Sequence, residues 1–165
     1  MGAASKAFVQ KTIASVGTAK ANVKELVDAI AGLTTATPIY IKYLTQVEAI
    51  TKNNPAHDIA SLEQSIPELR KLRTVCEAQG ERIQDCSHKI DEGYHAARLS
   101  IAGAKKVIEE FSAHCTEKAT HWNPLRKKSL SGNLKIIAKA RSDMGTIEKN
   151  FEMFEAAAKQ YGMLS

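Results

Sequence analysis

Aromatic residues are scarce in this chain and make up only 5% of its 165 residues. Proline is equally rare: four are present, and none occurs between Pro67 and Pro124. Scarce aromatics combined with abundant alanine and lysine favour helix over strand. No strand candidate is found, nor any internal repeat with a period of about 20–50 residues. The sequence therefore predicts an all-α protein.

Recognisable catalytic motifs are also missing. The glycines are isolated, so the chain has neither a Walker phosphate loop nor a Gly-x-Gly-x-x-Gly turn. No Gly-x-Ser-x-Gly elbow presents a serine nucleophile. Neighbouring acids such as Asp91 and Glu92 alternate with lysines, which is typical of a solvated helix face. We expect a protein that is not an enzyme and that holds no cofactor.

Two histidine clusters have the spacing of metal ligands. His88, Glu92 and His95 face one side of a helix, and two imidazoles with a carboxylate suit zinc or iron. They lie opposite Ile90 and Tyr94, however, and a di-metal bundle needs a second Glu-x-x-His sequence that this chain lacks. The same reasoning applies to the second cluster, which consists of His114, Glu117 and His121. We therefore expect no metal site.

Three cysteines are too few for a disulfide framework. They lie on an apolar stripe, so we expect buried free thiols and a reducing compartment, the cytoplasm. No secretory signal is recognised, and no window reaches the ~18 uncharged apolar residues of a membrane span. The start at Gly2 resembles a myristoylation signal, but Ser5 stands one place early. A peripheral position at a membrane, and export without a cleaved signal, both stay open.

The organising feature is an apolar stripe over residues 65–122. Its members recur every three or four positions, which places them on one side of an α-helix. The stripe runs through Leu69, Leu72, Cys76, Gln79, Ile83, Cys86, Ile90, Tyr94, Ala97, Ile101, Ala104, Ile108, Phe111, Cys115, Ala119 and Trp122.

Helix boundary signals divide the rest of the chain. Residues 3–33 predict a first helix that ends at Gly32 and the threonines after it. Thr37 and Pro38 predict the start of a short second helix, which ends at residues 53–55. A capping box from Ser65 to Glu68 predicts the start of the organising stripe. The last helix is predicted to begin near residue 129 or 131, after a loop of residues 126–128, and to stop at Gly162.

Length decides how the organising stripe is expected to fold. A continuous helix over residues 65–122 would be about 85 Å long, far longer than its predicted partners could cover. We therefore expect a break near Gly93 and an antiparallel up-and-down bundle of four long helices plus one short helix, in one domain spanning residues 1–165. The alternative is an extended, dimeric bundle with one helix of about 55 residues.

Basic residues are concentrated in two blocks. Residues 1–24 contain four lysines and no acidic residue, and residues 118–142 contain seven lysines and arginines and no acidic residue. The chain has a formal net charge of +5, so the remainder is net acidic. With a break near Gly93, both blocks are expected at one end of the bundle. Without the break, they are expected at opposite ends.

The basic end suggests a non-catalytic interaction module that contacts an anionic surface, either membrane phospholipid or an acidic protein. Nucleic acid is disfavoured because few aromatics are present for base stacking. Trp122 and Leu125 are candidate interfacial anchors. The candidate contacts are Lys6, Lys11, Lys118, Arg126, Lys127, Lys128, Lys135, Lys139 and Arg141.

Two other functions fit the sequence. The first is a structural or adaptor protein, including a homodimer, that acts through contacts between helices. The second is membrane insertion through a hairpin formed by residues 29–41, a stretch without any charged side chain.

Overall fold

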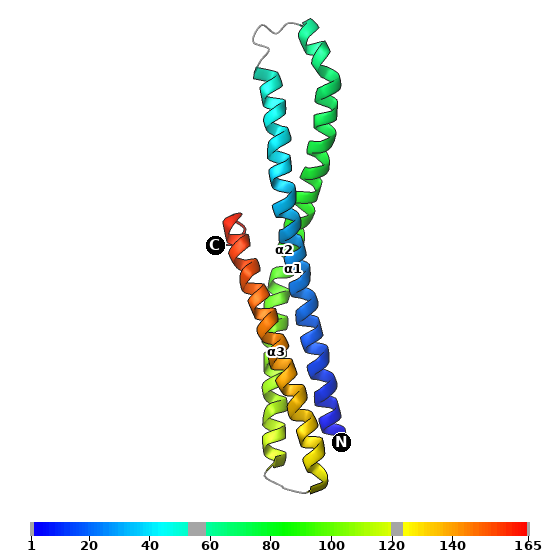
Figure 1. The fold of residues 1–165 in the computed structure, drawn as a ribbon, viewed down its shortest axis with the longest axis vertical. Helices are drawn as coiled ribbons and strands as arrows, with labels where there is room; N and C mark the ends of the chain where they lie inside the picture. The colour runs from blue at the N-terminus through cyan, green and yellow to red at the C-terminus, as the bar shows by residue number, and fades with distance from the viewer. Residues whose placement is uncertain (1, 53–58, 120–123, 165) are drawn as a thin grey trace. The chain divides into compact units, whose positions relative to one another are not determined.

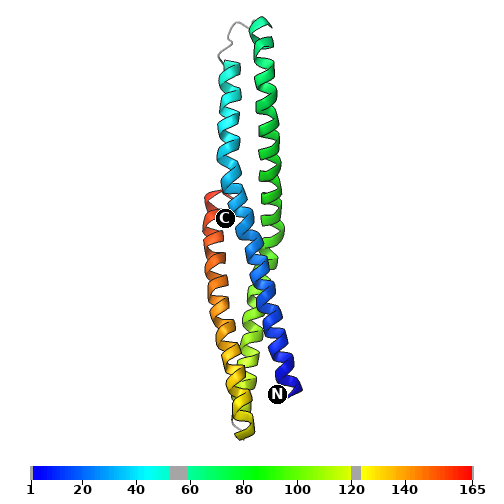
Figure 2. The same cartoon turned by 45° about the vertical axis from the view of Figure 1, so that its right-hand side comes forward.

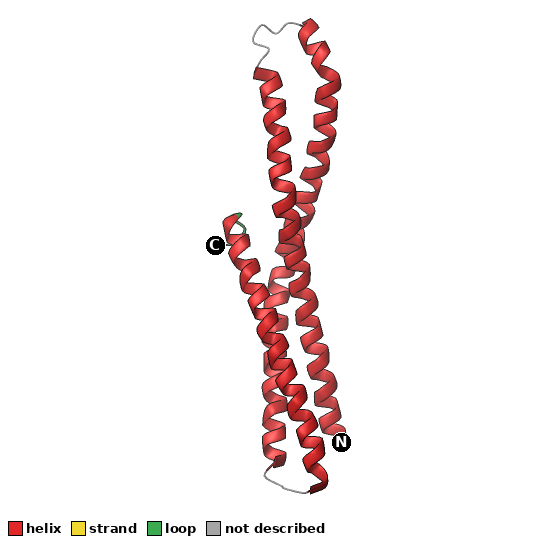
Figure 3. Cartoon of the chain, in the orientation of Figure 1, coloured by secondary structure: helices red, strands yellow, loops and turns green. Residues whose placement is uncertain are grey.

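The computed structural model describes residues 2–52, 59–119 and 124–164. These residues form three helices, α1 (Ala3–Lys52), α2 (Ile59–Ala119) and α3 (Pro124–Gln160) (Figure 1). No strand occurs in the described ranges, and Figure 3 shows the helices in red. The all-α prediction is confirmed. The predicted count of four long helices and one short helix is wrong, because α1 and α2 each continue through a position where a break was expected.

The first expected break, at Gly32 and Thr37, lies inside α1. The threonine hydroxyls turn back along the helix: Thr34 donates to the carbonyl of Ile30 at 2.8 Å, and Thr37 donates to that of Leu33 at 2.7 Å. Pro38 removes one backbone donor, but it lies on the exposed side, where water can satisfy the freed carbonyl. Residues 29–41 are therefore one helical stretch, and the hairpin expected for membrane insertion does not form.

The second expected break, at Gly93, is also absent. The 61 residues of α2 form one helix, as in the alternative prediction. The missing side chain of Gly93 serves packing, because a Cβ there would lie 3.2 Å from Cδ2 of Leu26. Glycine at this position lets α1 and α2 approach closely instead of ending the helix.

Helix starts were predicted less well than the final helix stop. Helix α2 begins at Ile59, so Ser65 and Pro67 lie inside it, and α3 begins at Pro124, so residues 126–128 are helical instead of a loop. The stop at Gly162 is confirmed. Gly162 has a φ of 69°, and the amide of Met163 donates to the carbonyl of Ala158 at 3.0 Å, which completes a Schellman motif.

The chain divides into two compact units. Unit 2 consists of Asp28–Ile90, where α1 and α2 pair in antiparallel directions. Glycines again mark the closest approach: a Cβ on Gly32 would lie 2.7 Å from Sγ of Cys86, and one on Gly80 would lie 3.7 Å from the ring of Tyr40. Two helices alone cover each other incompletely, and in residues 37–52 no side chain is fully buried.

Unit 1 consists of Met1–Val27 and Asp91–Ser165 and contains parts of all three helices. Figures 1 and 2 show these segments side by side, with α1 and α3 parallel to each other and antiparallel to α2. Phe111 and Phe154 are the largest fully buried side chains. The hydroxyl of Tyr94 donates to Oε2 of Glu155 at 2.8 Å, and both burial and this bond raise the pKa of Tyr94. The members of the predicted stripe that are buried in this unit are Ala97, Ala104, Ile108, Phe111 and Cys115.

The cysteines differ in burial more than the sequence predicted. All three are free thiols, but only Cys115 is buried, and Cys76 and Cys86 are half-buried. Burial raises the pKa of the Cys115 thiol. The expectation of three buried thiols is therefore correct for Cys115 alone.

We predict opposite effects of alanine at two helical glycines. Gly145→Ala should raise the free energy of unfolding by about 0.5–1 kcal/mol, because no atom lies within 4 Å of the new Cβ. Gly32→Ala should lower it by about 1 kcal/mol, because overpacking against Cys86 outweighs the gain in helix propensity. Urea denaturation followed by circular dichroism measures both. Cys86→Ala should restore stability to the Gly32→Ala variant, and equal stabilisation at both glycines would contradict the close approach.

Candidate functional site

The two basic blocks meet in unit 1. A Cβ on Gly2 would lie 3.5 Å from Nζ of Lys118, and Oγ of Ser5 lies 3.2 Å from Nε2 of His114. The start of α1 therefore lies beside the end of α2, and α3 begins at the same end (Figure 2). The prediction that an unbroken α2 would separate the blocks is wrong, because within unit 1 the first turn of α1 lies beside the last turn of α2.

The predicted contact residues are mostly solvent-exposed. Trp122 lies outside the described residues, and so do the side chains of Leu125 and Arg126. Lys118 is half-buried. The exposed members are Lys6, Lys11, Lys127, Lys128, Lys135, Lys139 and Arg141.

Helical spacing divides these residues among different faces. Lys128, Lys135 and Lys139 follow one another at intervals of seven and four, so they share one flank of α3. Lys6 and Lys20 lie fourteen residues apart and share one flank of α1. Lys11 and Lys127 fall on other faces by the same arithmetic. The two basic blocks of the sequence therefore form two lysine-bearing flanks, one on α1 and one on α3.

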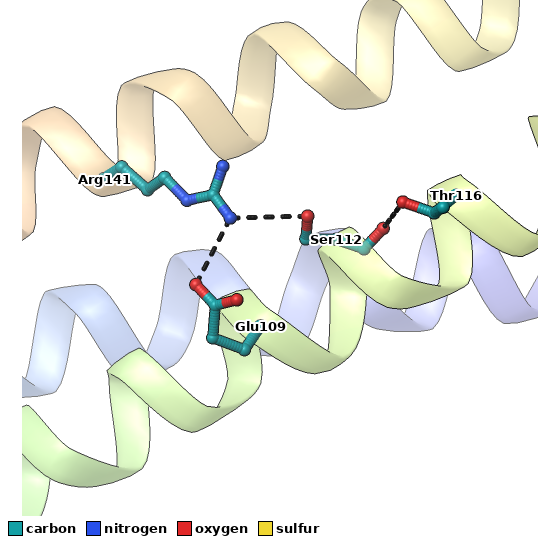
Figure 4. A network of polar contacts seen from close by, with 4 residues as sticks. All are labelled: Glu109, Ser112, Thr116 and Arg141. Atoms are coloured by element: carbon teal, nitrogen blue, oxygen red, sulfur yellow. Dashed lines mark hydrogen bonds and ion pairs between the residues drawn. The ribbon is translucent and has the colours of Figure 1, made fainter.

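Arg141 belongs to a different contact. Its Nη2 donates to Oε1 of Glu109 at 3.2 Å and to Oγ of Ser112 at 3.3 Å, and both partners lie on α2 (Figure 4). Figure 4 also shows the hydroxyl of Thr116, which donates to the carbonyl of Ser112 at 3.0 Å. Because Arg141 reaches across to α2, it is separated from the lysines on the other flank of α3.

A groove lies between the two lysine-bearing flanks. It has a volume of about 360 Å³. Apolar side chains form most of its surface, and Lys20 and Lys139 contribute one ammonium group from each helix. Asp143 is the one acidic residue that lines it. The lining residues are Thr12, Ile13, Val16, Gly17, Lys20, Ile136, Lys139, Ala140 and Asp143.

The other two helix interfaces of unit 1 have grooves of different chemistry. The groove between α2 and α3, of about 260 Å³, is lined by Glu148, Glu152 and Glu155 together with Arg98 and Lys105. The groove between α1 and α2, of about 290 Å³, has no charged side chain in its lining. Only the α1–α3 groove therefore combines an apolar surface with an excess of positive charge. We refer to it as the basic groove.

The usual burial pattern is reversed beside the basic groove. Thr12 is 0% exposed and Asn133 is 4% exposed, whereas their apolar neighbours Ile13 and Leu134 are 62% and 50% exposed. Placing polar residues inside and apolar residues outside normally destabilises a bundle. Such a reversal is expected where a binding surface competes with stability.

The hydroxyl of Thr12 is unusual among the threonines of this chain. The nine other described threonines each donate to the carbonyl four residues earlier. Oγ1 of Thr12 has no hydrogen-bond partner in the described part of the chain, although it is fully buried and lines the basic groove. A buried hydroxyl without a partner costs about 1–3 kcal/mol. Among the described residues that line the groove, Thr12 has the one buried side-chain donor without a partner.

Compared with protein-family models, curated protein sequences and solved structures, the chain matches none. Within the described residues, no three His, Cys, Asp or Glu side chains gather as metal ligands would. In the same residues, no helix has an apolar stretch long enough to cross a bilayer.

The groove residues that the sequence did not reveal are Thr12, Lys20 and Asn133. Ile13 and Leu134 are apolar and fit the helical spacing of the first and last predicted helices, so that spacing placed them in the core. Ser5, Thr12 and Ala19 follow one another with the same helical regularity on a neighbouring face. The polar residues in this series were the one sequence signal for a buried polar position on α1.

We predict that Thr12→Val raises the free energy of unfolding by roughly 1–2 kcal/mol. Valine has nearly the same shape and removes the unpartnered hydroxyl. Thr34→Val is the matched control, since the Thr34 hydroxyl already donates to Ile30, and it should give no increase. Urea denaturation of both variants measures the change in the free energy of unfolding. A loss of stability in Thr12→Val would mean that the hydroxyl has a partner in the folded protein.

Proposed function

We propose that this protein is a non-catalytic helical module that associates with anionic phospholipid surfaces through the basic groove and the lysines on its two walls. The observation that supports the proposal is the meeting of both basic blocks in unit 1. Lys6 and Lys20 lie on the α1 flank, and Lys128, Lys135 and Lys139 lie on the α3 flank. Of these five lysines, Lys20 and Lys139 line the groove.

Electrostatic attraction of this size is sufficient for membrane association. Each lysine near an anionic bilayer contributes about 1 kcal/mol, so five such lysines are enough for measurable binding. The helix termini act in the same direction on balance. Helices α1 and α3 both begin at this end without an acid in the first turn, and Lys118 lies in the last turn of α2.

The same lysines would also attract an acidic protein. The exposed Ile13 between Lys6 and Lys20 favours a bilayer, because an apolar side chain flanked by lysines fits the boundary between headgroups and acyl chains. Nucleic acid is less well matched, since the flanks carry no aromatic side chain for stacking.

We predict that the protein co-sediments with vesicles containing phosphatidylserine and stays in the supernatant with phosphatidylcholine vesicles. Reversing two charges in Lys135→Glu/Lys139→Glu should weaken binding about tenfold or more. Raising the salt concentration should also weaken it, because exposed charges are screened.

The matched control reverses two exposed lysines that lie outside both flanks, in Lys106→Glu/Lys159→Glu, one on α2 and one at the end of α3. It changes the net charge by the same amount but should bind more tightly than the groove variant. Equal losses in both variants would show that net charge alone acts. Binding that ignores lipid charge would contradict the proposal.

A second candidate function concerns unit 2, and a separate observation favours it. The two-helix pair leaves Ile41 55% exposed and Leu44 39% exposed, and a hollow of about 640 Å³ beside Tyr43 and Leu72 has a largely apolar lining. A helix from a second copy of the chain would cover this apolar face. We therefore propose helix-mediated dimerisation, an adaptor role, as the alternative.

Light scattering tests this alternative. A dimer should have twice the 18.0 kDa mass of the chain, and Leu44→Glu should return it to a monomer. Leu99→Glu, at a more exposed leucine of unit 1, is the control and should leave the mass unchanged. A monomer at all concentrations would exclude the dimer.

A further inference from the structure

The basic groove has separate places for the separate parts of a lipid molecule. Ile13, Val16 and Ile136 form an apolar surface, and Gly17 leaves space beside them, since nothing lies within 4 Å of where its Cβ would be. The volume of about 360 Å³ falls in the range of small-molecule sites. A single acyl chain fits a surface of this composition.

The polar groups of the groove supply a cation and a donor. Lys20 and Lys139 offer ammonium groups from opposite walls, which suits a phosphate. Thr12 lies two helical turns before Lys20 on the same helix, about 12 Å along its axis. Its unpartnered hydroxyl can donate to a carbonyl oxygen.

We infer that the basic groove binds an anionic monoacyl glycerophosphate unit, either as a free lysophospholipid or as part of a bilayer lipid. The phosphate lies between Lys20 and Lys139, the ester carbonyl accepts from the hydroxyl of Thr12, and the acyl chain covers Ile13 and Ile136. This inference rests on the proposed association with anionic phospholipid and assigns the groups that recognise it.

Asp143 reduces the positive charge of the basic groove without cancelling it. It follows Lys139 by one helical turn and also lines the groove, so a single carboxylate faces two ammonium groups. The site keeps an excess positive charge for a phosphate. A choline headgroup would lose part of this attraction, because its own cation meets the lysines.

The experiment is isothermal titration calorimetry of the full chain with lysophosphatidic acid below its critical micelle concentration. Lysophosphatidylcholine with the same chain tests the charge, and glycerol phosphate and inorganic phosphate test the headgroup alone. We expect lysophosphatidic acid to bind about tenfold more tightly than the choline lipid. The two phosphates without a chain should show no binding at millimolar concentration. Tight binding of either phosphate would overturn the role of the acyl chain.

Two substitutions locate the ligand. Gly17→Leu fills the groove and should weaken lysophosphatidic acid binding about tenfold or more, whereas Gly145→Leu, at a glycine equally free of neighbours, should leave it unchanged. Thr12→Val should weaken binding about tenfold at most, and Thr12→Ser should restore it. Unchanged binding in Gly17→Leu would overturn the inference.

The outcomes separate this inference from the proposed function. If the wild-type protein binds anionic vesicles but not lysophosphatidic acid, the association with membranes stands and the groove site is wrong. If it binds neither, both are wrong. Light scattering on the same samples tests whether a second copy of the chain occupies the groove instead. If the wild-type protein is a dimer and Gly17→Leu dissociates it, a helix of the second copy lies in the groove and the lipid site is wrong.

Discussion

Close approach of α1 and α2 at glycine positions is the constraint on which the rest of the structure depends. Gly32 faces Sγ of Cys86 in unit 2, and Gly93 faces the side chain of Leu26 in unit 1. Because side chains are missing at these points, α1 and α2 approach each other closely within each unit. Within unit 1, the first turn of α1 lies beside the last turn of α2, and α3 starts at the same end. The meeting of the basic blocks follows from this pairing.

Stability and the proposed binding make opposite demands on this end of unit 1. A bundle chosen for stability alone would bury Ile13 and Leu134 and expose Thr12 and Asn133. The structure has the reverse arrangement, with an unpartnered hydroxyl on Thr12 and an unpartnered Oδ1 on Asn133 among the described residues. The core of the same unit, around Phe111 and Phe154, offsets this cost in stability. Natural proteins commonly accept such local costs where a surface must remain available for a ligand.

The sequence predicted the helical class, the stripe on α2, the stop at Gly162 and the existence of two basic blocks. It failed where local and tertiary preferences compete. Glycine, proline and clustered threonines disfavour a helix locally, but packing against Cys86 and hydrogen bonds to the preceding turn reverse that preference at Gly32 and Thr37. The groove itself could not be predicted from apolar spacing, because two adjacent series on α1 fit the period equally well. Only the packed structure shows that Thr12, and not Ile13, faces the core.

The proposed function requires that lysines of α1 and lysines of α3 contact one anionic surface together. It is tested most directly by nuclear magnetic resonance with isotope-labelled protein and bilayer discs that contain phosphatidylserine and a lipid spin-labelled at the headgroup. The proposed function predicts paramagnetic broadening of the backbone amides around Lys20 on α1 and Lys139 on α3 in the same sample. With neutral discs it predicts no broadening. Broadening confined to one of the two helices, or equal broadening with neutral discs, would contradict it.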